Sequence, residues 1–213
     1  RGINVHSLMI LRGNKVACEA WSKPLTSEMP HMAYSVSKSF LSTAYGFALA
    51  EGKITRGTRF VDVFPEFKNK KDKYLEKLTI HQLLCMTAGK QTAIRGSKSD
   101  DWLKVFIKAK WIFEPGTSWR YVNDNYYIAS KMLCKVLGES ISDYLTPRLF
   151  EPLGIDVPFW EHSPDGVEAG GWGLMLKTED IAKLVLCYQN KGKYNGIQVI
   201  PEWWTREDRK STR

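Results

Sequence analysis

The chain has 213 residues, of which 43% are hydrophobic, and a formal net charge of +8 at pH 7. That length is enough for a single domain with a sizeable core. There is no internal repeat, no low-complexity stretch and no apolar run that approaches the length of a membrane span, so we expect neither a repeat architecture nor a membrane-spanning helix.

The positive charge does not by itself predict nucleic-acid binding, and we expect no nucleic-acid partner. The densest basic run, Lys68 to Lys73, contains an acidic residue, Asp72, and is followed by one aromatic, Tyr74. A nucleic-acid surface is expected to carry more arginine and interleaved aromatics. We therefore interpret the run as a solvated loop or helix face and keep nucleic-acid binding as the weakest alternative.

The metal-ligating residue types are scattered. Neither the four cysteines nor the four histidines have the spacing of a zinc site, so we predict no metal and no cofactor. Buried free thiols fit a reducing compartment, which favours a cytoplasmic location, and two disulfides stay open as the alternative. The chain opens on Arg1 without a visible signal peptide, so a trimmed leader, with a periplasmic or secreted protein, also stays open.

The first predicted element is a β-hairpin over residues 5–21. Two alternating strands, Val5–Arg12 and Lys15–Trp21, flank the two-residue turn Gly13-Asn14. Pro24 and Pro30 then bracket an irregular connector.

A mostly helical region is predicted over residues 32–195. Apolar periodicity, capping residues and glycine stops predict helices at Ser35–Glu51, Thr79–Met86, Asp101–Ile112, Asn123 or Asp124 to Leu137, Ser142–Leu149 and Thr178–Tyr188. A small hairpin is expected at Gly192–Val199, and a charged tail after Trp203-Trp204. The fold class is thus α+β in one domain, residues 1–213. A lone hairpin needs further strands or helices to cover it, and the sequence does not obviously supply those strands.

Ser35-Val36-Ser37-Lys38 is the one S-x-x-K string in the chain. Residues three apart on a helix share a face, so Lys38 can reach the Ser35 hydroxyl. A desolvated lysine at the positive end of a helix dipole should have a lowered pKa and can accept a proton from the alcohol. The Ser35 backbone N–H would serve as an oxyanion donor. The alternative interpretation is a helix start with capping serines and a surface lysine.

Tyr121-Val122-Asn123 follows a turn-rich loop that leads into a helix. A tyrosine held near a lysine can relay a proton to a leaving group, and Asn123 can bind both the lysine and a substrate carbonyl. The alternatives are a core aromatic for Tyr121 and a helix N-cap for Asn123. No G-x-S-x-G elbow, P-loop, H-E-x-x-H or G-x-G-x-x-G is present, and a Ser-His-Asp triad assembled through space stays open.

These motifs lie within ordered blocks that resemble the serine β-lactamase and penicillin-binding-protein superfamily. The similarity is greatest to its class C-like branch, with the esterases and 6-aminohexanoate-dimer hydrolases. The blocks are Leu8–Trp21, the SVSKSF segment with Phe47–Ile54, Phe64-Pro65-Glu66, Leu78–Gly89, Phe113–Thr117, Tyr121-Val122-Asn123, Glu151–Ile155, Gly170–Leu174 and Thr178-Glu179-Asp180.

The resemblance implies a β-lactamase/transpeptidase-like fold, with an antiparallel sheet beside a large helical region. It also implies an acyl-enzyme mechanism on small amide, ester or β-lactam substrates. In that mechanism Ser35 is the nucleophile, Lys38 the base or base partner, Tyr121 the proton relay and Asn123 a contact for substrate and lysine.

The family's third motif, a K-T-G or H-x-G on a strand, is missing. The nearest string, Lys177-Thr178-Glu179, precedes a predicted helix and has glutamate in place of glycine. The resemblance therefore predicts an incomplete sheet whose C-terminal strands are absent. Two functional readings follow: an active serine hydrolase, or a catalytically impaired fragment or binding protein on the same scaffold. A partner chain or dimer that completes the sheet is included among the expected partners.

Overall fold

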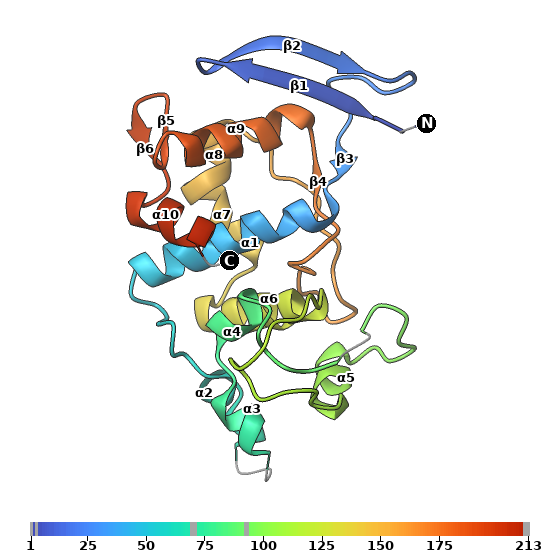
Figure 1. The fold of residues 1–213 in the computed structure, drawn as a ribbon, viewed down its shortest axis with the longest axis vertical. Coiled ribbons are helices and arrows are strands. Elements are labelled where there is room, and N and C mark those ends of the chain that lie inside the picture. Colours follow the sequence, from blue (N-terminus) through green and yellow to red (C-terminus); the bar gives the residue numbers. More distant parts are fainter. Residues whose placement is uncertain (1, 3, 69–71, 92–93, 211–213) are drawn as a thin grey trace.

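The computed structural model describes residues 2, 4–68, 72–91 and 94–210. At the top of Figure 1, β1 (Ser7–Arg12) and β2 (Lys15–Trp21) form an antiparallel hairpin in which Ser7 is opposite Trp21. The turn residues Gly13 and Asn14 both have positive φ, as a two-residue hairpin turn requires. One face of β1 packs on α9 (Thr178–Gln189), and the other carries the exposed side chains of Leu8 and Ile10.

Helix α1 (Ser37–Ala50) crosses the middle of the molecule (Figure 1). Eleven of its 14 residues are buried, including four polar ones, so the helix is enclosed by other elements on most sides. It contacts α6 (Asp124–Leu137), α7 (Ile141–Leu145) and α10 (Glu202–Lys210). A Cβ on Gly46 would lie 2.4 Å from the Trp204 ring, so this glycine allows α10 to approach closely.

A short antiparallel pair, β3 (His31–Met32) and β4 (Met175–Leu176), precedes α1. The Ala33 amide extends this ladder by donating to the Leu174 carbonyl oxygen at 2.8 Å. The sequence did not predict these two-residue strands. The pairing of β3 with β4 holds the segment that contains residues 170–176 against the start of α1.

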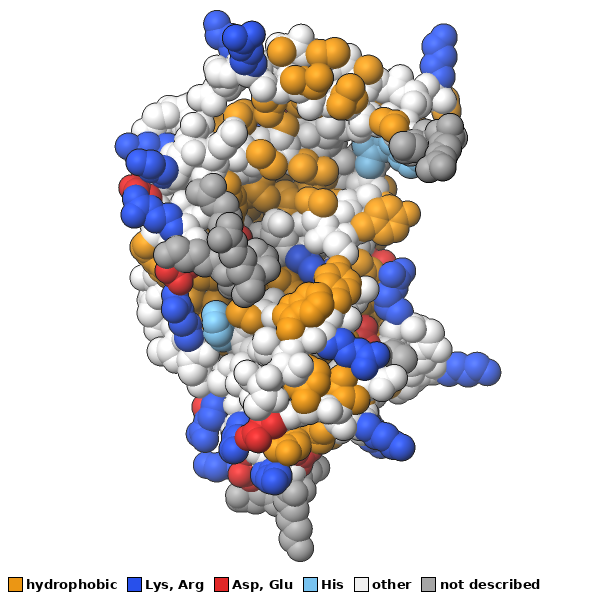
Figure 2. Space-filling view, in the orientation of Figure 1, with side chains coloured by type: hydrophobic (Ala, Val, Ile, Leu, Met, Phe, Trp, Pro, Cys, Tyr) orange, Lys and Arg blue, Asp and Glu red, His pale blue; other side chains and the backbone are white. Residues whose placement is uncertain are grey.

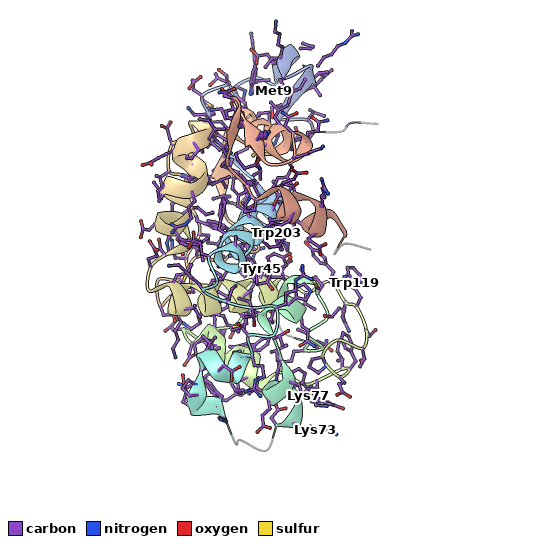
Figure 3. All side chains as sticks on the ribbon, turned by 90° about the vertical axis from the view of Figure 1, so that its left-hand side faces the viewer. Met9, Tyr45, Lys73, Lys77, Trp119 and Trp203 are labelled. Carbon is purple, nitrogen blue, oxygen red and sulfur yellow. The ribbon has the colours of Figure 1, made fainter. Side chains whose placement is uncertain are left out.

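The lower part of Figure 1 is helical. Its elements are α2 (Phe60–Val63), η2 (Pro65–Phe67), α3 (Lys73–Lys77), α4 (Ile80–Leu84) and α5 (Trp102–Lys108), and α4 packs across α6. The predicted N-cap Thr79 accepts from the Gln82 amide at 3.2 Å. Lys73 and Lys77 lie at the lower end of the molecule, away from α1 (Figure 3). Residues 69–71 of the basic run lie outside the described residues.

Helix α5 is shorter than the predicted Asp101–Ile112. It ends at Lys108 because the buried Lys90 ammonium donates to the carbonyl oxygens of Ile107 and Ala109, at 3.0 and 2.8 Å. Beyond that point Trp111 forms a bridge with Lys90 instead of continuing the helix.

The rest of the chain completes the core. After α7 come η3 (Thr146–Phe150) and α8 (Glu151–Leu153). The small hairpin of β5 (Lys193–Tyr194) and β6 (Ile197–Gln198) follows β4 and α9 and lies close to the predicted one. The expected charged tail is the helix α10, which buries Trp204 and Thr205. In the part of the chain that the structure describes, helices together with three two-stranded antiparallel sheets make the fold α+β, as predicted.

Three further findings bear on function. No helix among the described residues is long and apolar enough to span a membrane. Within the same ranges, no three His, Cys, Asp or Glu side chains are grouped so as to hold a metal ion. All four cysteines are free.

Candidate active site

Ser35 lies in η1 (Tyr34–Val36), the single 3₁₀ turn that leads into α1, and its side chain is exposed. Lys38 lies three residues further on, in the first turn of α1, and residues three apart along a helix share a face, which brings its side chain to Ser35. Tyr34 has φ +44°, a strained conformation for a residue with a side chain. The buried Ser37 hydroxyl donates to the Tyr34 carbonyl oxygen at 2.6 Å and accepts from the Leu174 amide at 3.3 Å.

The Lys38 ammonium is buried, with 8% of the residue exposed. It donates three hydrogen bonds, to Ser35 Oγ at 3.1 Å, Asn123 Oδ1 at 2.8 Å and the Gly171 carbonyl oxygen at 2.7 Å. Among the described residues no carboxylate forms an ion pair with it. Burial lowers the pKa of Lys38, although Tyr121 opposes the shift by favouring the charged amine.

Tyr121 Oη lies 2.6 Å from Ser35 Oγ, and either oxygen can be the donor. Burial would raise the pKa of Tyr121. Hydrogen bonds with Ser35 and Lys38, together with the lysine charge, outweigh that effect and lower the pKa. The loop is anchored on Met86, whose carbonyl oxygen accepts from the Arg120 amide at 3.0 Å. Tyr121 is thus a half-exposed phenol within reach of both Ser35 and Lys38.

Asn123 occupies the N-cap position of α6, but its side chain makes no capping hydrogen bond. Its Oδ1 atom accepts from Lys38 instead, so the N-cap alternative does not describe this side chain. The structure therefore brings together all four predicted site residues: Ser35, Lys38, Tyr121 and Asn123.

Two contributors were not predicted. Gly171 supplies a carbonyl oxygen to Lys38, and a Cβ at this position would lie 2.9 Å from Tyr126 Cβ and 3.0 Å from the Asn123 carbonyl oxygen. Only glycine fits there without displacing its neighbours. Ser37 links the Ser35 turn to Leu174. The Gly170–Leu174 block was noted in the sequence, but a backbone carbonyl leaves no residue-type pattern that would identify it.

A cavity of about 500 Å³ opens beside these residues and extends along α1 to α10. Its lining includes Lys38, Tyr121, Trp119 and Trp204. Trp119 lies at the edge of the molecule below Trp203 (Figure 3). Ser35 itself does not line the cavity, but Lys38 and Tyr121, which both contact its hydroxyl, do.

The model of the Beta-lactamase family matches residues 1–202. A beta-lactamase of Escherichia coli (strain K12) is 26% identical over 219 aligned positions, covering 89% of this chain and 57% of that protein. Penicillin-binding protein 4 of Amycolatopsis lactamdurans is 28% identical over 137 positions, covering 62% of this chain and 36% of that protein.

Solved structures show the same fold. A putative 6-aminohexanoate-dimer hydrolase from Bacillus anthracis superposes with a TM-score of 0.83 at 17% identity, covering 95% of this chain and 58% of that one. A putative beta-lactamase from Bacteroides dorei gives 0.80 at 15% identity, covering 94% and 62%. The chain thus spans about three fifths or less of the length of these relatives. By the match over residues 1–202, the chain belongs to the β-lactamase family.

Proposed function

We propose that the chain is a serine hydrolase that cleaves amide, ester or β-lactam bonds through an acyl-enzyme on Ser35. The observation that carries the proposal is the position of Ser35 Oγ, 2.6 Å from Tyr121 Oη and 3.1 Å from Lys38 Nζ. Both neighbours have lowered pKa values, so each can give up its proton nearer to neutral pH than an isolated lysine or tyrosine.

The reaction has two halves. Lys38 and Tyr121 together accept the Ser35 proton while Oγ attacks the substrate carbonyl carbon, forming a tetrahedral oxyanion. As that intermediate collapses, the bond to the leaving group breaks, and Tyr121 passes the proton to the leaving nitrogen or oxygen. Water then attacks the ester carbonyl and gives a proton to the same pair. As the bond from the acyl carbon to Oγ breaks, the pair returns that proton to Oγ, which releases the acid and regenerates the Ser35 hydroxyl.

Asn123 supports this chemistry by holding Lys38 and by offering its amide N–H₂ to the substrate. Its Oδ1 faces the lysine, which leaves the nitrogen as a donor. The Ser35 backbone N–H is the proposed oxyanion donor.

The proposed class of substrate is inferred from the substrates of the similar proteins. The relatives include a beta-lactamase and a putative 6-aminohexanoate-dimer hydrolase, whose names give a β-lactam and a 6-aminohexanoate dimer as their substrates. A direct test compares hydrolysis of p-nitrophenyl acetate and of a chromogenic cephalosporin by wild-type and Ser35→Ala protein. We expect turnover of at least one substrate by the wild type and none by the variant. Equal rates for the two proteins would contradict the proposal.

A second candidate is a protein that binds a partner strand without catalysis. In the described residues β1 and β2 pair only with each other, and hydrophobic side chains cover part of the hairpin's surface in Figure 2. Exposed strand edges with apolar side chains are templates for a further strand. Size-exclusion chromatography with light scattering distinguishes the cases, because a monomer at every concentration counts against completion by a second copy.

A further inference from the structure

A second hollow, of about 360 Å³, adjoins the candidate active site. It shares Tyr121 and Asn123 with that site, and Arg95 and Arg120 add two guanidinium groups to its lining. The remaining lining residues are Gln91, Val122 and Asp124. Any group that enters this hollow lies beside the residues that contact Ser35 and Lys38.

The Arg95 side chain has a fixed aromatic support. Its guanidinium carbon lies 5.3 Å from the ring centre of Trp172, over the ring. Trp172 is buried, with an exposed fraction of 3%, and its indole N–H donates a hydrogen bond to the Glu161 carboxylate at 2.9 Å. A guanidinium held over a ring keeps its in-plane N–H groups available, and those groups match the two oxygens of a carboxylate.

The charge of the hollow favours an anion. Within the described ranges neither Arg95 nor Arg120 forms an ion pair, and both are exposed. The one carboxylate in the lining is that of Asp124, which is buried and accepts from the Ile94 amide at 2.8 Å. Two positive charges against one negative charge leave the hollow with a formal charge of +1.

We propose that this Arg95–Arg120 hollow is a subsite for a carboxylate carried by the substrate, on a part of the molecule separate from the bond that is cleaved. The proposal rests on the proposed function, because it gives that hydrolase a preference for esters or amides of acids with a second, free carboxylate. Charge-assisted hydrogen bonds to one or both guanidinium groups supply the recognition.

The test uses two esters of equal chain length. The p-nitrophenyl ester of hexanoic acid is neutral, whereas the p-nitrophenyl monoester of adipic acid ends in a carboxylate. We expect the wild type to have the higher kcat/KM for the adipate ester. In Arg95→Ala and in Arg120→Ala the ratio of the two kcat/KM values should fall by about tenfold or more.

Arg12→Ala is the matched control, because it removes one exposed positive charge from the distant end of β1. It should keep the wild-type ratio, which separates the subsite from general attraction by a basic protein. The same ratio in all four proteins, while the hexanoate ester is hydrolysed, would overturn the subsite and leave the hydrolase intact.

A binding measurement keeps the proposal testable if neither ester is hydrolysed. Saturation-transfer NMR with monomethyl adipate on Ser35→Ala protein needs no turnover. We expect monomethyl adipate to give a saturation-transfer signal, and methyl hexanoate to give none. In the Ser35→Ala/Arg120→Ala double variant the signal of monomethyl adipate should be weaker. Equal signals from both compounds would overturn the subsite, whereas the failure of turnover alone would count against the proposed function.

Discussion

Lys38 Nζ lies 2.7 Å from the Gly171 carbonyl oxygen, which joins two residues that are 133 positions apart in the chain. This bond uses one of the three ammonium donors and directs the other two to Ser35 and Asn123. The lysine is therefore held by the glycine-rich segment as well as by its own helix. In the proposed mechanism this fixed position keeps the amine beside the Ser35 hydroxyl.

Lys38→Met should abolish most of the proposed acylation. Methionine keeps the length of the side chain but loses the amine, and a general base typically contributes about 10²–10⁴ in rate. The Asn123 and Gly171 oxygens also lose their donor, so we expect a loss of about 1–3 kcal/mol in the free energy of unfolding. Stopped-flow acylation and urea unfolding measure the two effects. Lys104→Met, at an exposed lysine of α5, should change neither.

Tyr121→Phe should slow acylation and shift its pH dependence. The rate rises with pH as Lys38 loses its proton, and Tyr121 raises the pKa of that lysine. Removing the hydroxyl therefore lowers the Lys38 pKa further, and the rising limb of the remaining rate should move to lower pH. A pH–rate profile of acylation for both proteins checks the direction. A limb that moves to higher pH would contradict the assignment of Lys38 as the base.

Ser37→Ala should weaken the link between the Ser35 turn and the 170–174 segment. The Ser37 hydroxyl is the donor to the Tyr34 carbonyl and the acceptor from the Leu174 amide, and the residue is fully buried. We expect a loss of about 1–3 kcal/mol in stability and roughly tenfold slower acylation, with the same pH profile. Ser39→Ala, at the exposed neighbour two residues on, is the matched variant. Equal effects at both positions would argue against a positioning role.

Lys90 should make stability depend on alkaline pH. Burial lowers its pKa from 10.5 to about 8, against an opposing effect of Asp72. Between about pH 8 and 10.5 the unfolded chain binds more protons than the folded one, so this group makes the fold more stable as pH rises. From pH 8 to 9.5, wild type should gain about 1–2 kcal/mol relative to Lys90→Met in urea unfolding. A constant difference between the two proteins would show that Lys90 keeps an ordinary pKa in the fold.

The sequence predicted the site contact between residues that are close in the chain better than the contacts between residues that are far apart in it. The spacing of Ser35 and Lys38 predicts their contact because a helical turn places residues three apart on one face. The loop motif offered Tyr121 and Asn123 as candidates, but only the resemblance placed them beside Ser35, since nothing in their local pattern points to a residue 86 positions earlier. The Gly171 contact belongs to a backbone carbonyl and depends entirely on tertiary structure.

The same distinction applies to the fold. Turn chemistry at Gly13-Asn14 and capping at Thr79 are encoded within a few residues, and those elements were predicted near their observed positions. Helix α5 ends early because Lys90, from another part of the chain, caps its carbonyls. Strands β3 and β4 are each two residues long, too short for any alternation to show.

The central claim is that Ser35 is a nucleophile. The most direct measurement is intact-mass and peptide mass spectrometry after incubation with a fluorophosphonate probe. We predict one adduct per chain, on the peptide that contains Ser35, with no adduct on Ser35→Ala protein. Folded wild-type protein that acquires no adduct between pH 6 and 10, or an adduct that persists in Ser35→Ala, would contradict the account.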